Sequence, residues 1–175
     1  GEKVYDENLG DGFNRSHPAL AGLTINTALI DEKLPVLIIG IDKSLVNQRA
    51  LHQQLFETGA LQGVNWVVYV DPEAVNIRLQ DITWLVANNI DPLRDCFYAK
   101  ANLNTDVPPM AIDGSRKSLS TDGFHRQWPN VLAMDDETIR QVDELWGKLG
   151  LGEFIPSPSL NYKGLVKNEG AVAKG

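Results

Sequence analysis

Hydrophobic residues in the first half of the chain form two short continuous runs, at residues 35–41 and 64–70. Both runs are rich in β-branched residues and end at polar or turn-forming residues, a pattern typical of strands that are buried on both faces. Between them, apolar residues recur at helical spacing over residues 45–57, and Ser44 is the predicted N-cap. This order predicts a crossover unit that joins two parallel strands.

The second half repeats the alternation with shorter elements. An apolar stripe predicts a helix over residues 79–88, which ends before Pro92 because the residue before a proline avoids helical angles. Residues 96–99 and 110–112 are short strand candidates. A final helix is predicted to begin after the N-cap Asp135 and to stop at Gly150. Its apolar positions are Ile139, Val142, Leu145, Trp146 and Leu149.

These elements predict an α/β fold with a small mixed sheet, packed helices in the order β-α-β-α-β-β-α, and long irregular ends. Residues 1–33 have weak periodicity and are predicted to be a linker or lead-in from an upstream domain. Residues 34–150 form the predicted α/β domain. Residues 151–175 are rich in proline and glycine and are predicted to be an extended or mobile tail.

Charge and composition narrow the function classes. The 175 residues include 16 Lys and Arg against 23 Asp and Glu, a net charge of −7, and no basic stripe, which argues against nucleic-acid binding. No apolar run approaches the roughly 18 residues that a membrane-spanning helix needs, so we expect no transmembrane segment. Cys96 is the sole cysteine, which favours a cytoplasmic location. Three scattered histidines make a zinc site from this chain alone improbable.

Two basic positions are candidates for binding an anion. Lys43 follows the first predicted strand at its carboxyl end, where open α/β sheets bind ligands, but a solvated loop lysine is the favoured interpretation. Residues 113–117, Asp-Gly-Ser-Arg-Lys, could form an anion-binding turn. The favoured alternative is a polar turn whose basic residues face water.

Residues 91–95 place two carboxylates around Arg94. An acid/base pair is one interpretation, and a structural ion-pair turn between a helix and a strand is the favoured one, because the arginine would keep both acids ionised. The sequence contains no dinucleotide-binding, Walker A or nucleophile-elbow motif. The residues alone therefore indicate an acidic α/β domain without a self-contained active site.

Several segments between residues 34 and 150, taken in order, carry a resemblance to a known family. They are residues 38–43, 66–71, 81–86, 91–95 and 111–117, the pair Trp128-Pro129, and the helix 136–149. Together they resemble the C-terminal part of the UbiD-like decarboxylases. These enzymes use prenylated flavin and include the polyprenyl-hydroxybenzoate decarboxylases of ubiquinone and menaquinone biosynthesis.

The resemblance implies a fragment of a carboxy-lyase that decarboxylates an aromatic or α,β-unsaturated acid. The family's prenylated FMN, its divalent metal (manganese) and its catalytic Glu-Arg-Glu residues belong to upstream segments. No catalytic, cofactor-binding or metal-binding residue is therefore assigned in this chain, and we expect it to be inactive alone.

The resemblance also implies partners. They are the upstream catalytic domain of the same chain, whose cleft this domain closes on one side, and further copies in a homo-oligomer. The candidate subunit-interface residues are Ile139, Val142, Leu145, Trp146 and Leu149. Two other interpretations stay open: a non-catalytic α/β binding or assembly module, and a small-molecule enzyme that uses Lys43 and the loop 113–117.

Overall fold

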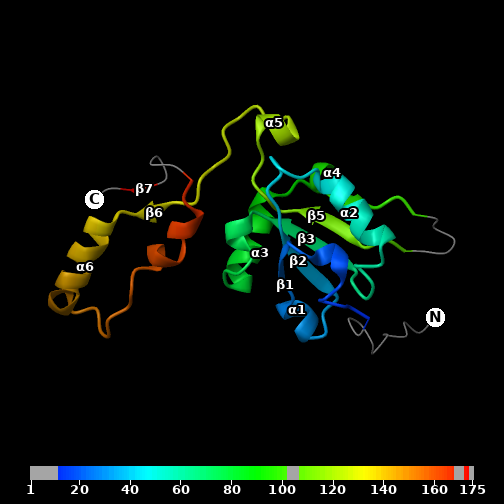
Figure 1. Cartoon of the computed structure of the whole chain (residues 1–175). Coiled ribbons are helices and arrows are strands. Elements are labelled where there is room, and N and C mark those ends of the chain that lie inside the picture. The colour runs from blue at the N-terminus through cyan, green and yellow to red at the C-terminus, as the bar shows by residue number, and fades with distance from the viewer. Residues whose placement is uncertain (1–11, 102–106, 168–171, 174–175) are drawn as a thin grey trace, which may run out of the picture. The chain divides into compact units, whose positions relative to one another are not determined.

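A computed structural model describes residues 12–101 and 107–167 and the backbone of residues 172–173. The chain divides into two compact units, Gly1–Arg126 and Gln127–Gly175 (Figure 1). The division falls after Arg126, whereas the sequence pattern predicted boundaries after residues 33 and 150. No helix in the described part of the chain combines the length and the apolar character needed to cross a membrane.

The first unit contains a five-stranded mixed sheet in the order β1-β2-β3-β5-β4. Its parallel centre confirms the predicted crossover unit and the predicted α/β fold, because β2 pairs with β3 and β3 pairs with β5 in parallel. The edge strands β1 and β4 run antiparallel to their neighbours. The strands are β1 (Thr24–Asn26), β2 (Val36–Gly40), β3 (Trp66–Val70), β4 (Cys96–Tyr98) and β5 (Met110–Asp113).

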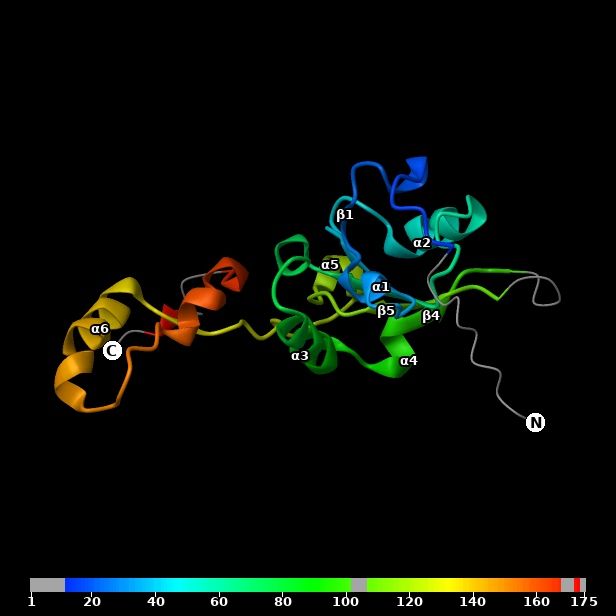
Figure 2. The same cartoon turned by 90° about the horizontal axis from the view of Figure 1, so that it is seen from below.

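Helices α2 (Gln48–Glu57) and α3 (Leu79–Asn89) cover opposite faces of this sheet (Figure 2). Leu55 of α2 is fully buried and belongs to the same core cluster as Leu37 and Val67. The opposite face is packed so closely that a Cβ at Gly114 would lie 2.6 Å from Cγ2 of Val86, a residue of α3. Four short helical segments complete the connections: α1 (Ala28–Asp31), η2 (Pro72–Ala74), α4 (Pro92–Asp95) and α5 (Leu119–Asp122).

The predicted start of α2 was wrong by three residues. The amide and the hydroxyl of Ser44 both donate to Oδ1 of Asp42, at 2.9 and 2.6 Å, so Ser44 closes a turn instead of capping a helix. Asn47 is the N-cap, and its side chain accepts from the amide of Ala50. An aspartate two residues before a serine can accept from the amide and the hydroxyl of that serine, and this local turn is an alternative to helix capping.

The described part of residues 1–33 contributes to the first unit, although its weak periodicity predicted a lead-in. Strand β1 pairs with β2, and Leu20 and Ile30 are buried in the core, at 4% and 7% exposure. A short helical turn, η1 (Pro18–Leu20), positions the first of them. These apolar residues are spaced irregularly because each belongs to a different short element, so no stripe marks them in the sequence.

The second unit is built around α6 (Asp136–Leu149), whose predicted limits are confirmed. Asp135 accepts from the amide of Thr138 at 2.7 Å, and Gly150 ends the helix with a φ of 64°. The predicted tail contains two short helical turns, η3 (Pro158–Asn161) and η4 (Lys163–Leu165). The two-residue strands β6 (Ala133–Met134) and β7 (Val172–Ala173) pair in parallel.

Candidate functional site

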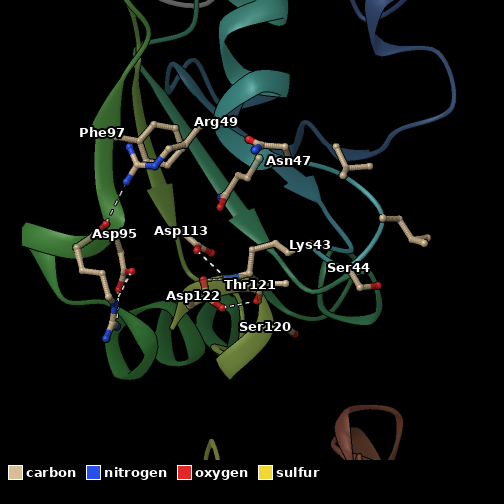
Figure 3. Close-up of a pocket in the computed structure, with 14 residues that line it drawn as sticks. Lys43, Ser44, Asn47, Arg49, Asp95, Phe97, Asp113, Ser120, Thr121 and Asp122 are labelled. Atoms are coloured by element: carbon tan, nitrogen blue, oxygen red, sulfur yellow. Dashed lines mark hydrogen bonds and ion pairs between the residues drawn. The ribbon is translucent and has the colours of Figure 1, made fainter. Parts of the chain in front are cut away.

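A pocket of about 530 Å³ lies at the carboxyl edge of the first unit's sheet (Figure 3). The parallel strands β2, β3 and β5 all end at this edge, and β4 begins there because it runs antiparallel to β5. The pocket is lined by residues 43–49, by residues near the start of β4, by Asp113 and by residues 120–122. Open α/β sheets bind ligands at this edge, since loops and helix N-termini converge there.

Asp113, the last residue of β5, is the centre of a buried cluster of charges below the pocket. Its Oδ2 lies 2.9 Å from Nζ of Lys43 and 3.1 Å from Nζ of Lys117. Its Oδ1 accepts from the amide of Ser115 at 3.0 Å and from the hydroxyl of the same residue. Two lysines and a serine thus hold one carboxylate that is 5% exposed.

Lys117 is fully buried, so the prediction that this basic residue faces water was wrong. Its ammonium group donates to the carbonyl oxygens of Asp113 and Ser115, at 2.7 and 2.9 Å. Burial lowers the pKa of Lys117, although the charge of Asp113 opposes that shift. The carboxylate and the two carbonyls occupy its donors, so Lys117 is a structural cation and is not available to an external anion.

The predicted ion-pair turn at residues 91–95 is confirmed for Asp95, whereas Asp91 caps α4 by accepting from the amide of Leu93. Arg94 donates to both carboxylate oxygens of Asp95, at 2.8 and 2.7 Å, and the amide of Asp91 also donates to this carboxylate at 2.7 Å. Burial alone would raise the pKa of Asp95, but these hydrogen bonds and the charge of Lys117 lower it below its ordinary value. Asp95 is therefore held ionised and is not suited to donate a proton.

Lys43 is also paired, which contradicts the favoured interpretation as a solvated loop lysine. Its ammonium group lies 2.5 Å from Oδ1 of Asp122 as well as 2.9 Å from Asp113, and its side chain is 10% exposed. Asp122 belongs to α5, 79 residues further along the chain. Burial opposes ionisation of Asp122, but the hydrogen bond from Lys43 and two from α5 lower its pKa.

The cluster is electrically balanced and does not fit a divalent metal. Each of its three carboxylates has a lysine or arginine at 3.1 Å or less, so the positive charge that a metal would supply is already present. Among the described residues, no group of three or more His, Cys, Asp or Glu side chains could hold a metal ion. The members of the cluster are Lys43, Arg94, Asp95, Asp113, Lys117 and Asp122.

Gln48, the first residue of α2, was not singled out in the sequence. It lines the pocket, is 8% exposed, and its Nε2 has no hydrogen-bond partner among the described residues. An unsatisfied buried donor costs about 1–3 kcal/mol. Its neighbour Arg49 lies over the ring of Phe97, 4.2 Å from its centroid, and also lines the pocket. Glutamine is an ordinary helix-forming residue, so nothing in the sequence marks this arrangement.

His52 was also missed as a buried polar residue. Its Nε2 donates to the carbonyl of Pro109 at 3.1 Å, so in the neutral ring Nδ1 accepts from the hydroxyl of Tyr69 at 3.0 Å. Burial lowers the pKa of His52, which favours this neutral form. These contacts join α2, β3 and the start of β5, so His52 is a structural residue of the core.

The five candidate interface residues of α6 differ in their surroundings. Ile139 is buried, and Trp146 donates to the carbonyl oxygens of Gly152 and Glu153 at 3.2 and 3.1 Å. The other three are 43–52% exposed, which leaves an apolar strip along the helix. We call this strip the α6 face, and its members are Val142, Leu145 and Leu149.

Comparison with known sequences gives distant relatives of unassigned function. The sequence matches no protein-family model. An uncharacterized protein from Archaeoglobus fulgidus is 29% identical over 69% of this chain. Uncharacterized proteins from Aquifex aeolicus and Aeropyrum pernix are 29% and 30% identical over 48% and 55% of the chain. The alignments cover 29%, 19% and 22% of the relatives, so the chain matches less than a third of the length of each.

Comparison with solved structures gives partial matches. An evolved dimeric form of the UbiD-class enzyme HmfF from Pelotomaculum thermopropionicum, in complex with prFMN, matches 65% of this chain and 24% of its own with a TM-score of 0.40 and 19% identity. The same enzyme in complex with FMN matches 55% of this chain and 24% of its own with a TM-score of 0.37 and 20% identity. TM-scores this low do not establish a common fold.

Proposed function

We propose that this chain is the C-terminal domain of a longer UbiD-like carboxy-lyase, which decarboxylates an aromatic or α,β-unsaturated acid. One observation carries the proposal. Three of the segments that carry the family resemblance, residues 38–43, 91–95 and 111–117, supply most members of the buried charge cluster. Segments that resemble the family and are separate in the sequence thus supply residues that contact one another in a single cluster.

The chemistry of the cluster supports a domain that lies beside a catalytic centre and does not itself contain the catalytic residues. Its carboxylates are paired with lysines and an arginine, so the pocket has neither a spare acid nor a metal-ligand set. In the proposed enzyme, upstream segments would hold both the prenylated FMN, which would supply the decarboxylation chemistry, and its divalent metal. This domain would close one side of the cleft in a cytoplasmic enzyme, with quinone biosynthesis as one setting.

The decisive experiment compares this chain with the longer natural polypeptide. Both are mixed anaerobically with prenylated FMN and Mn²⁺, and release of CO₂ is measured from a panel of aromatic and α,β-unsaturated acids. We expect release by the longer protein and none by this chain. Turnover by the chain alone, or no turnover of any acid by the longer protein loaded with flavin, would overturn the proposal.

We further propose that the α6 face contacts a second copy of the chain. Three large apolar side chains are 43–52% exposed on one helix, and burying them would remove apolar area from water. Replacing Leu145 and Leu149 together with glutamate should shift the mass measured by light scattering toward the monomer. The matched control replaces the exposed helix residues Gln141 and Lys148 with glutamate. Equal masses for both double variants would contradict this contact.

A non-catalytic binding module is the second candidate function. The observation that favours it is the pocket itself, which is lined by hydrogen-bond donors while each of its carboxylates is paired with a lysine or an arginine. The CO₂ experiment separates the two candidates, because a binding module predicts no turnover even by the longer protein.

A further inference from the structure

The N-terminus of α2 leaves hydrogen-bond donors at the wall of the pocket. The first amides of a helix have no intrahelical acceptor. In α2, the amide of Ala50 donates to the side chain of Asn47, and the amide of Leu51 donates to the backbone carbonyl of Asn47. The amides of Gln48 and Arg49 have no backbone acceptor among the described residues. These two amides lie at the positive end of the helix dipole.

Two side chains add donors at the same place. The Nε2 of Gln48 is buried and lacks an acceptor in the described part of the chain, although its residue lines the pocket. The guanidinium group of Arg49 stacks on Phe97, donates from Nη2 to the carbonyl oxygen of Arg94 at 3.4 Å, and has no carboxylate partner among residues 12–101 and 107–167. A planar guanidinium held on an aromatic ring still presents its edge to a carboxylate or a phosphate.

The rest of the pocket selects the charge and the kind of ligand. Its carboxylates are neutralised from below by Lys43, Arg94 and Lys117, so they neither attract a cation nor cancel the donors of α2. Leu45 and Val46 line the pocket with side chains that are 81% and 39% exposed. Apolar side chains exposed beside a set of donors suit a ligand that has an apolar part.

We propose that this pocket binds a small organic anion, with its carboxylate or phosphate group at the N-terminus of α2 and its apolar part against Leu45 and Val46. Gln48 and Arg49 are the recognition residues, and the buried cluster is the rigid floor. The site consists of this chain's own residues, so it does not depend on the proposed decarboxylase relationship.

The test is a titration of the ¹⁵N-labelled full chain followed by NMR. The probes are phenyl phosphate, benzoate, inorganic phosphate and the neutral benzyl alcohol. We expect both aromatic anions to shift the amide signals of Gln48 and Arg49, inorganic phosphate to bind more weakly, and benzyl alcohol to leave these signals in place. Absence of shifts with every anion, or equal affinity for benzyl alcohol, would overturn the site. Inorganic phosphate that binds as tightly as phenyl phosphate would overturn the apolar part of the proposal.

Substitution of Gln48 separates recognition from structure. The variant Gln48→Leu removes an unsatisfied buried amide, so we expect a melting temperature at or above that of the parent chain. It also removes a donor to a charged acceptor, which should weaken binding of phenyl phosphate by roughly tenfold or more. Gln54→Leu, the same substitution at an exposed position of α2, is the matched control and should leave affinity unchanged. Unchanged affinity in Gln48→Leu would contradict the assignment.

The variant Arg49→Leu tests charge selection. It keeps an apolar side chain beside Phe97 but removes the guanidinium group. We expect benzoate to lose its advantage over benzyl alcohol in this variant. A preserved preference for benzoate would remove Arg49 from the site.

Discussion

Two groups of paired charges, the buried cluster of the first unit and the ion pairs on α6 of the second, have opposite surroundings. In the first unit, Lys117 is fully buried and lies 3.1 Å from Asp113, whose side chain is 7% exposed. In the second unit, Arg140 pairs with Glu137 and Glu144 on α6, where all three side chains are 56–61% exposed. The buried Lys117–Asp113 pair is required for stability, because either charge alone would be costly to bury. The exposed pairs of Arg140 contribute little, because water screens them.

Leucine side chains on α2 and α6 also differ in exposure, but here the exposed side chain is the one in the second unit. Leu55 of α2 is fully buried against the sheet, but Leu145 of α6 is 46% exposed. The segment after α6 adds Leu151, Phe154 and Ile155, which are 52–62% exposed. The first unit thus buries a charge cluster and packs Leu55 of α2 against its sheet, whereas α6 of the second unit leaves an apolar strip that another molecule can cover.

The largest expected difference in stability is between two substitutions that each remove one charge, one in the first unit and one in the second. Lys117→Met leaves the carboxylates of Asp113 and Asp95 short of a buried partner, so we expect a loss of about 3–5 kcal/mol in the free energy of unfolding. Arg140→Met breaks exposed pairs and should change that free energy by little more than experimental error. Urea denaturation of both variants measures the difference. Equal losses would show that the buried cluster is not a structural requirement.

A second pair of substitutions compares packing. Gly114→Ala places a Cβ 2.6 Å from Cγ2 of Val86, so we expect a loss of about 1–3 kcal/mol from overpacking. Gly147→Ala meets nothing within 4 Å in the last turn of α6 and should stabilise the chain by up to about 0.5–1 kcal/mol through helix propensity. Thermal unfolding followed by circular dichroism measures whether each substitution lowers or raises the stability. Stabilisation by Gly114→Ala would contradict the close approach of α3 to the sheet.

The smallest expected effect is a pH dependence confined to the first unit. Because burial lowers the pKa of His52, the unfolded state binds its proton at a higher pH than the folded state. Stability is therefore complete above the ordinary pKa of about 6.5 and falls as the pH decreases below it. Denaturation at pH 7.5 and 5.5 should reveal this loss, and His52→Gln should be less stable overall but nearly independent of pH in this range. A profile of unchanged slope in that variant would assign the effect to other groups.

The sequence allowed prediction of the elements whose signals are local. The strands β2 and β3 are continuous apolar runs, and α6 has a capping aspartate, an apolar stripe and a terminal glycine within sixteen residues. Each of these signals lies within the element that it predicts. The same holds for the ion-pair turn at residues 91–95, where both partners are adjacent in sequence.

The charge cluster and the pocket could not be predicted in the same way, because their contacts are distant along the chain. Lys43 meets Asp113 and Asp122 across 70 and 79 residues, and no spacing rule relates them. Its sequence environment is that of any loop lysine. The side-chain amide of Gln48 likewise lacks a partner because of how the pocket wall packs around it, and the helix sequence does not show this.

We propose that the central strands of the first unit are covered by that unit's own residues, whereas the α6 face of the second unit is covered by a second copy of the chain. Hydrogen exchange of the whole chain, measured by mass spectrometry at low and high protein concentration, tests it most directly. We expect β2, β3 and β5 to be strongly protected at both concentrations, and α6 to be weakly protected in dilute solution and better protected when concentrated. Protection of α6 equal to that of the sheet at both concentrations would contradict the claim.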